Sequence, residues 1–253
     1  MARRIVPRRL SHDEEATLVE HLTELRHRLL ICIVALVPAF AIAYAFHAQL
    51  IGRLMDLVPE GTPIVTLGVT EPFTTSLKVS FYAAIAIVLP ILLWQLWAFL
   101  APAVSDDTQR VLGVFVVLAT FLFVTGVLFC YAIVLPKALS FLVDYDSELY
   151  TEQIRASYFL SFVALTLLAF GIAFEMPIFV LALVRLGVLS ADRLRQNRRI
   201  GYVAMLAFAI LLPTVDPVSL VLEVAPLLVL YELSIWIAVV MERRWERSAA
   251  EAL

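Results

Sequence analysis

Six long apolar runs constrain this chain more than any other feature of its sequence. A helix needs about 20 apolar residues to cross the hydrocarbon layer of a membrane. Of the 253 residues, 62% are hydrophobic and only 16% are charged, which excludes a water-soluble enzyme and a disordered chain. We therefore expect one all-α polytopic membrane domain over residues 1–253, with six transmembrane helices at about 29–46, 79–104, 111–136, 156–184, 200–215 and 218–240.

The distribution of basic residues predicts how these spans are oriented. Cytoplasmic loops of membrane proteins are enriched in Lys and Arg. Here 15 of the 19 basic residues lie before the first span or after the second, fourth and sixth. Both termini are therefore expected in the cytoplasm, which agrees with an even number of spans. The basic residues left on the outer side are Arg53, Lys78, Lys137 and Arg155.

The segments outside the spans also carry predictable patterns. An apolar stripe marks the N-terminal segment and consists of Leu18, Leu22, Leu25 and Leu29. Its spacing predicts an amphipathic helix that runs directly into the first span. Residues 50–58 place apolar side chains on one face, which predicts a short helix lying flat at the outer surface. Residues 136–155 are expected to form an outer loop.

No enzyme motif is present in the sequence. Zinc-protease, nucleophile-elbow, phosphate-loop and dinucleotide-binding patterns are all missing, and the four histidines lie outside the apolar runs. The basic residues follow the membrane topology rather than forming a nucleic-acid surface. We therefore expect no catalytic residue, no cofactor, no metal and no nucleic-acid partner.

Glu175 is the ionisable residue that stands out, because it interrupts the fourth apolar run. A charge at the middle of a membrane costs about 2.5–3.5 kcal/mol on insertion scales. Pro177, two residues later, cannot donate a backbone hydrogen bond, so a kink is expected there. Two interpretations stay open: the carboxyl forms the polar floor of a functional cavity, or it bonds a neighbouring helix and only stabilises the bundle.

Two more glutamates lie in the sixth run. Glu223 and Glu232 are nine residues apart, so they point to opposite sides of one helix and cannot form a carboxylate pair. We expect Glu223, near the outer end, to be solvated and Glu232 to pack against another span. The Asp216–Pro217 step before this run predicts a turn, because a residue preceding proline is disfavoured in a helix.

Glu24 has a simple local interpretation. Arg28 follows it by four residues, and such a pair on a helix surface contributes a few tenths of a kcal/mol. From periodicity alone, an ion pair of this kind is the favoured reading.

A set of short motifs in order along nearly the whole chain resembles the TatC family, the multi-span subunit of the twin-arginine protein translocase. The motifs are HLTELRHRL at 21–29, EPF at 71–73, WAFLAP at 97–102, SYFLSF at 157–162, FEMP at 174–177 and PTVD at 213–216. The resemblance implies a concave, cup-like bundle of six spans with short fifth and sixth helices, in the plasma (inner) membrane of a bacterium. It also implies a receptor for the twin-arginine signal peptides of folded precursor proteins.

The same resemblance implies partners and a source of energy. TatA- and TatB-type single-span subunits and further TatC copies are expected to assemble with the chain within the membrane lipid. Transport is then expected to be driven by the proton-motive force.

Residue by residue, the resemblance implies a binding site for the signal peptide. Glu24 matches the recognition carboxylate of the family, with Leu25, Arg26 and Phe99 as its matching neighbours. Arginine binds carboxylates with planar, charge-assisted geometry, which suits a motif of two arginines.

The chain departs from the family pattern in the loop after the second span. A second recognition glutamate is common there, and Thr108 occupies the aligned position. Asp106 and Asp107 are candidates to replace it. Glu175 resembles an intramembrane glutamate that faces the cup, and Asp216 an outer turn that contacts a partner.

A proton-coupled solute transporter is the alternative function, with Glu175 as its substrate carboxylate. Such transporters place their site between repeated halves. No internal repeat is visible in this sequence.

Overall fold

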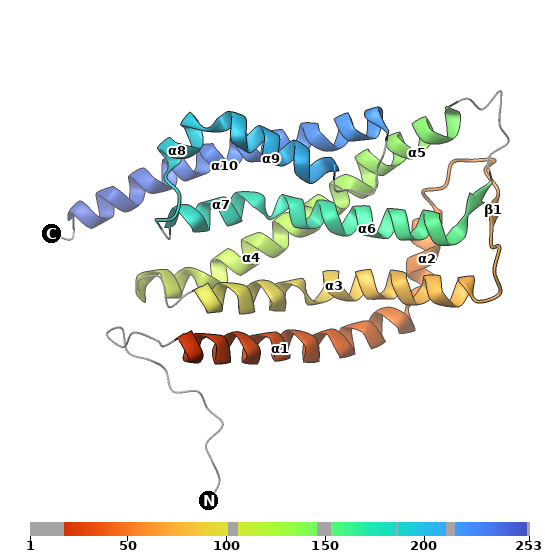
Figure 1. Cartoon of the computed structure of the whole chain (residues 1–253), viewed down its shortest axis with the longest axis horizontal. Helices are drawn as coiled ribbons and strands as arrows, with labels where there is room; N and C mark the ends of the chain where they lie inside the picture. The colour runs from red at the N-terminus through yellow and green to blue at the C-terminus, as the bar shows by residue number, and fades with distance from the viewer. Residues whose placement is uncertain (1–17, 101–105, 146–152, 186, 211–215, 252–253) are drawn as a thin grey trace, which may run out of the picture.

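The computed structural model describes residues 18–100, 106–145, 153–185, 187–210 and 216–251, and these are almost entirely helical (Figure 1). The helices are α1 (Leu18–Ala45), α2 (His47–Met55), α3 (Glu71–Leu100), α4 (Asp106–Phe129), α5 (Leu135–Asp144), α6 (Ala156–Phe174), α7 (Met176–Arg185), α8 (Ala191–Gln196), α9 (Arg198–Ile210) and α10 (Pro217–Glu251). A π-helical turn, η2 (Cys130–Val134), joins α4 to α5. Two short strands, β1 (Ile64–Val65) and β2 (Ile154–Arg155), pair in parallel.

Five helical segments within the described residues are long and apolar enough to cross a membrane. They are His21–Ala45, Glu71–Phe99, Gly113–Asp144, Ala156–Arg185 and Pro217–Glu242. The expected fifth span corresponds to α9, whose 13 residues are too few for this group. At 1.5 Å per residue, α9 is about 20 Å long. The last residues of that expected span, 211–215, lie outside the described part of the chain.

The N-terminal helix and the first span are one element, as the leucine stripe predicts. The helix α1 runs without interruption from Leu18 to Ala45. The short helix expected at residues 50–58 is present but begins earlier: α2 spans His47–Met55 and lies across the ends of α1 and α3 (Figure 1).

Two boundaries differ from the sequence-based expectation. The helix α3 begins at Glu71 rather than at residue 79, because Pro72 lies in its first turn, where a missing N–H costs nothing. The outer loop expected from residue 136 is wrong in its first part, since helix continues to Asp144. The π turn explains this: the Leu135 N–H donates to the Cys130 carbonyl five residues back, and the widened turn accommodates Pro136.

The fourth run is interrupted at the place where a kink is expected. The helix α6 ends at Phe174, α7 begins at Met176, and Glu175 lies between them. Pro177 is in the first turn of α7, so its missing N–H cannot continue the hydrogen-bond ladder of α6.

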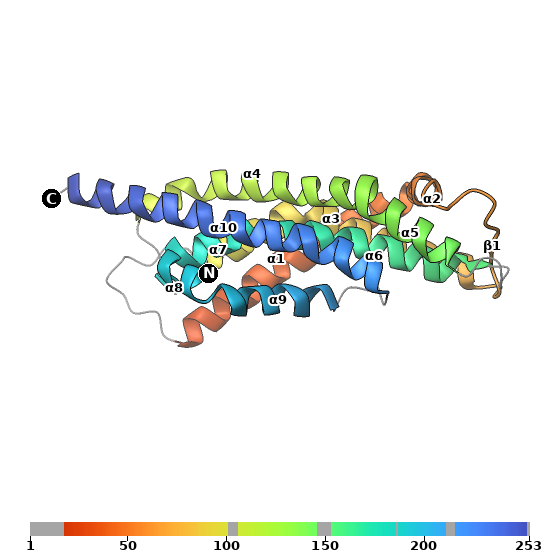
Figure 2. The ribbon, with the colours of Figure 1, turned by 90° about the horizontal axis from the view of Figure 1, so that it is seen from above.

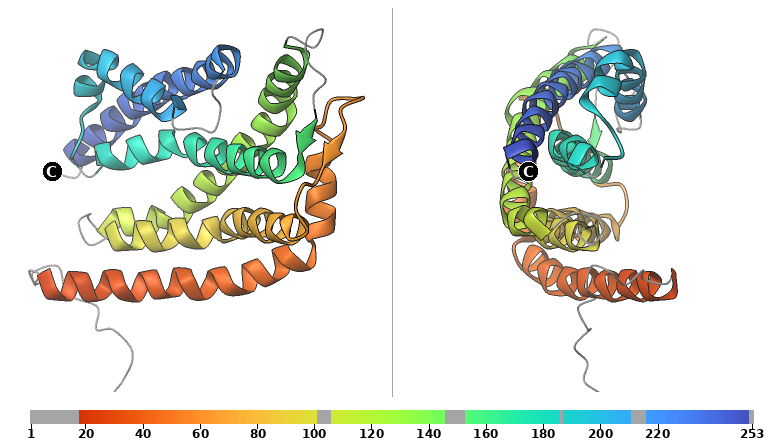
Figure 3. Two further views of the ribbon diagram at one scale, coloured as in Figure 1. Left: turned by 45° about the vertical axis from the view of Figure 1, so that its right-hand side comes forward. Right: turned by 90° about the vertical axis from the view of Figure 1, so that its left-hand side faces the viewer.

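The helices are arranged along an arc. Seen along the molecule in the right-hand view of Figure 3, the arc runs from α1 through α4 and α10 to α9, with α6 and α7 on its inner side. Figure 2 agrees, since α4 and α10 lie along one side and α9 along the other. The most extensive packing is that of α1 on α3, α4 on α6, and α10 on α7.

Glycines allow the closest helix approaches. A Cβ added at Gly171 of α6 would lie 2.4 Å from the Phe123 ring of α4. One at Gly201 of α9 would lie 2.0 Å from the Tyr231 ring of α10. Both distances are far below van der Waals contact, so a larger residue at either position would require the aromatic ring or the helix backbone to move.

The two ends of the molecule differ in what they carry. The start of α1, the start of α4, α8 and the end of α10 lie at one end, called here the α8 end; α2, the end of α5 and β1 lie at the other, called the β1 end (Figure 1). The elements with the basic residues expected in the cytoplasm thus share the α8 end.

Candidate functional site

Glu24 and Arg28 form the predicted ion pair on α1, near the α8 end. The Arg28 Nε lies 3.0 Å from Glu24 Oε1, and Nη2 of the same guanidinium also donates to that oxygen. The Glu24 side chain keeps 33% of its surface exposed, so a further donor can reach it from outside.

Side-chain contacts join this part of α1 to α3. The third nitrogen of Arg28, Nη1, donates to Gln95 Oε1 at 3.3 Å. His21 stacks on Phe99, with ring centroids 4.3 Å apart. Phe99 thus contacts α1 at His21, three residues before Glu24, and Arg28, which holds Glu24, contacts α3 at Gln95, a residue that sequence reasoning did not single out.

The other candidate residues of this site are described less fully. Leu25 and Arg26 are exposed on α1. Asp106, Asp107 and Thr108 form the first turn of α4, which begins at the α8 end. The side chains of these three residues lie outside the described part of the structure.

Glu175 lies apart from this group, at the junction of α6 and α7. Its side chain is buried, and its Oε1 accepts no hydrogen bond from the residues that the structure describes. The cluster beside it is apolar and includes Ala173, Val180 and Val184. A carboxyl in these surroundings has polar capacity that the described part of the fold does not use.

The expectation that Glu223 is solvated is wrong, because its side chain is completely buried. Its helix, α10, packs against η2, α5 and α6 at this level rather than facing solvent, and the adjacent Leu222 contacts the apolar cluster there. Glu232, by contrast, behaves as predicted and binds another helix: it accepts a hydrogen bond from the Tyr202 hydroxyl and forms a 3.1 Å ion pair with Arg198 of α9.

Asp216 starts α10 rather than forming only a turn. Its Oδ1 accepts a hydrogen bond from the Ser219 backbone N–H at 2.7 Å, and Pro217 occupies the first helical position. This is the usual arrangement of an N-cap aspartate followed by proline. Capping accounts for the residue type at this position.

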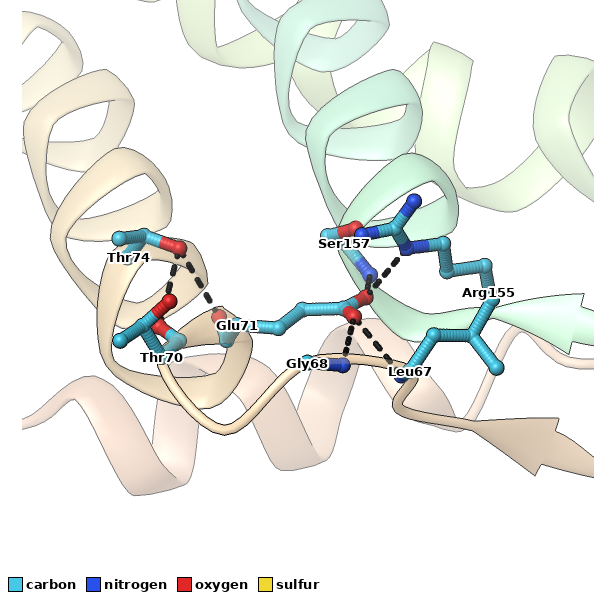
Figure 4. Close-up of polar contacts among 7 residues, drawn as sticks. All are labelled: Leu67, Gly68, Thr70, Glu71, Thr74, Arg155 and Ser157. Atoms are coloured by element: carbon cyan, nitrogen blue, oxygen red, sulfur yellow. Dashed lines mark hydrogen bonds and ion pairs between the residues drawn. The ribbon is translucent and has the colours of Figure 1, made fainter.

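Glu71 accepts four hydrogen bonds, although sequence reasoning did not place it in a site. Figure 4 shows its carboxylate between two loops: Oε1 accepts from Arg155 Nε at 3.0 Å and from the Ser157 N–H at 3.2 Å. Oε2 accepts from the N–H groups of Leu67, at 2.9 Å, and Gly68, at 3.2 Å. The only sequence signal for it was an acid at the start of the EPF motif.

The four donors make Glu71 a joint between distant segments. They come from the loop before α3, from β2 and from the start of α6, next to the pairing of β1 with β2. The Glu71 carboxylate raises the pKa of the Arg155 guanidinium above its ordinary value, mainly through their hydrogen bond. The guanidinium also lies over the Tyr158 ring, 5.1 Å from its centroid.

Known proteins resemble this chain over most of its length. The sequence profile of the TatC family, described as "Sec-independent protein translocase protein (TatC)", matches residues 20–226. Relatives with that description include one from Aquifex aeolicus, 36% identical over 235 residues (90% of this chain, 96% of the relative). Those from Deinococcus radiodurans and Escherichia coli are 34% and 31% identical over 229 and 231 residues, covering 87% and 90% of this chain and 84% and 90% of themselves.

Solved structures resemble it as well. A crystal structure described as the twin arginine translocase receptor TatC in DDM superposes with a TM-score of 0.79 at 34% sequence identity. The match covers 87% of this chain and 99% of that one. A second crystal structure of the same receptor gives a TM-score of 0.77.

Proposed function

Because this chain belongs to the TatC family of Sec-independent protein translocase proteins, we propose that it binds the twin-arginine signal peptides of folded precursor proteins. Family membership makes the chain a membrane-embedded component of a protein translocase and not an enzyme. Membership of this family argues against the alternative function, a proton-coupled solute transporter.

The observation that carries the proposal is the partly exposed Glu24 carboxylate on α1, one helical turn after the contact of His21 with Phe99. A guanidinium can donate two parallel hydrogen bonds to a carboxylate and stack on an aromatic ring. Each hydrogen bond to the charged group contributes about 1.5–3 kcal/mol. Two arginines held in this way give an affinity strong enough for recognition and weak enough for release of the precursor. Leu25 and Arg26 flank the carboxylate on α1, and Asp106, Asp107 and Thr108 supply the second half of the site.

The proposed topology has six spans with both termini in the cytoplasm of a bacterial cell, in its plasma (inner) membrane. In this arrangement α9 is the fifth span, and its described length of about 20 Å favours a locally thinned bilayer. The α8 end then faces the cytoplasm, where signal peptides arrive.

The chain assembles, in this proposal, with TatA- and TatB-type single-span subunits and with further copies of itself. Glu175 is the intramembrane polar site that a partner helix or local water contacts, and Asp216 lies at an outer turn that a partner meets. The proton-motive force drives transport.

Co-purification with a twin-arginine precursor tests the proposal most directly. We expect the chain to retain a precursor with an Arg-Arg signal and to lose one with a Lys-Lys signal. Glu24→Gln should abolish retention while the protein still inserts and folds, because an amide keeps the shape but not the charge. Glu60→Gln, an exposed position beyond α2, serves as the matched control. Equal retention by wild type and Glu24→Gln would contradict the proposal.

Two further variants test the remaining residues. Asp106→Asn combined with Asp107→Asn should weaken retention further, and unchanged retention would show that these aspartates take no part. Glu175→Leu should leave the protein at normal abundance but impair transport. If this variant transports as well as the wild type, Glu175 has only a structural role.

A further inference from the structure

We propose that Arg28 and Gln95 are positioning residues for Glu24, and that they make the site selective for guanidinium over ammonium groups. The inference rests on the proposed function. It concerns the hydrogen-bonded chain that runs from Gln95 on α3 through Arg28 to Glu24 on α1.

Arg28 contacts one of the two carboxylate oxygens of Glu24. Both Nε and Nη2 of Arg28 donate to the same oxygen of Glu24, Oε1. Arg28 therefore holds the carboxylate through one oxygen and does not occupy Oε2. An incoming guanidinium can bind Oε2 without breaking the internal pair.

Gln95 on the neighbouring helix α3 holds the Arg28 side chain in place. Nη1 of Arg28 donates to Gln95 Oε1, so each of the three guanidinium nitrogens has an acceptor. The Arg28 side chain is only 21% exposed. A planar group held at three corners cannot swing, so the rotamer of Glu24 is fixed relative to α3, which also carries Phe99.

The net charge of the Glu24–Arg28 pair affects which cations the site attracts. The Glu24–Arg28 pair is neutral as a unit, so it attracts a cation much less strongly than a lone carboxylate would. A ligand must instead present donors in the right directions at Oε2, which planar arginine does better than lysine. Without Arg28, the site becomes a free carboxylate that attracts Lys and Arg alike.

Binding of two fluorescent signal peptides to the purified full-length chain tests this inference. One peptide carries Arg-Arg and the other Lys-Lys. We expect Gln95→Leu to weaken Arg-Arg binding by on the order of fivefold, because the anchor is lost while both charges remain. We expect Arg28→Gln to strengthen Lys-Lys binding, so that the ratio of the two affinities falls by on the order of fivefold.

Matched controls and a conservative variant keep the result interpretable. Gln49→Leu and Arg53→Gln make the same changes at exposed positions of α2 and should leave both affinities at wild-type values. Arg28→Lys preserves the charge but not the three-cornered contact, so it should lower Arg-Arg binding even if Arg28→Gln fails to fold.

The outcomes separate this inference from the proposed function. If Glu24→Gln loses Arg-Arg binding while Gln95→Leu and the Arg28 variants keep the wild-type affinities for both peptides, the positioning inference is overturned and the proposed function stands. If Glu24→Gln also binds normally, both are overturned.

Discussion

Two glutamates at opposite ends of the molecule, Glu71 and Glu24, have the same side chain but differ in hydrogen bonding and exposure. Glu71, at the β1 end, accepts four hydrogen bonds on its two oxygens, and its side chain is 4% exposed. Glu24, at the α8 end, receives the Arg28 guanidinium on one oxygen and is 33% exposed.

The difference lies in where the donors come from. Three of the four donors to Glu71 are backbone N–H groups, which are held in place by the chain itself, so that carboxylate is a closed joint. Within the described part of the chain, the donors to Glu24 belong to one side chain on the same helix, and part of the carboxylate stays accessible. A closed carboxylate stabilises the fold, whereas an open one can accept donors from a ligand.

The largest effect on stability should come from removing the Glu71 carboxylate. Glu71→Ala leaves two backbone N–H groups of the loop before α3 and the Arg155 side chain without their acceptor. We expect the midpoint of thermal unfolding in detergent to fall by about 5 °C. Because the α8 end is remote, Arg-Arg peptide binding should stay within about twofold of wild type. Loss of peptide binding with normal thermal stability would reverse the roles assigned to the two ends.

Salt should produce an intermediate effect, and at the α8 end only. Raising the salt concentration from about 50 mM to about 500 mM shortens the Debye length to a few ångströms, which screens exposed charges far more than buried ones. Arg-Arg peptide binding should weaken by about fivefold. A fluorescence titration measures this, and the midpoint of thermal unfolding, which depends on the buried Glu71 joint, should change much less over the same salt range. Salt-independent binding by the wild type would mean that recognition does not depend on an exposed carboxylate.

The smallest effect should come from a conservative change within the closed joint. Arg155→Lys keeps the positive charge beside Glu71 but loses the planar group that lies over Tyr158. We expect the unfolding midpoint to fall by about 1–2 °C. Arg53→Lys, at an exposed position of α2, should have no effect. A loss as large as that of Glu71→Ala would show that the guanidinium, rather than the backbone donors, holds the joint together.

Local features of the site were predictable from the sequence because they depend on near neighbours. The Glu24–Arg28 pair follows from a spacing of four residues on a helix. The break at Glu175 follows from Pro177 two residues later. Neither depends on how distant segments pack.

Long-range features could not be predicted in the same way. Arg155 and Ser157 lie more than 80 residues from Glu71, and their meeting depends on the packing of α6 against α3. The burial of Glu223 depends on which elements cover α10, and the helix beyond Pro136 depends on a π turn that no residue spacing revealed.

By itself, the sequence determined that this chain is a membrane protein built of long helices, because backbone groups in lipid must be hydrogen-bonded internally and continuous apolar runs of this length meet that requirement as helices. The motifs also indicated the family. The tertiary structure decided which carboxylates are closed and which stay open, because hydrogen bonding and exposure depend on donors that folding brings from remote parts of the chain. That distinction separates the structural Glu71 from Glu24, where we propose that the signal peptide binds.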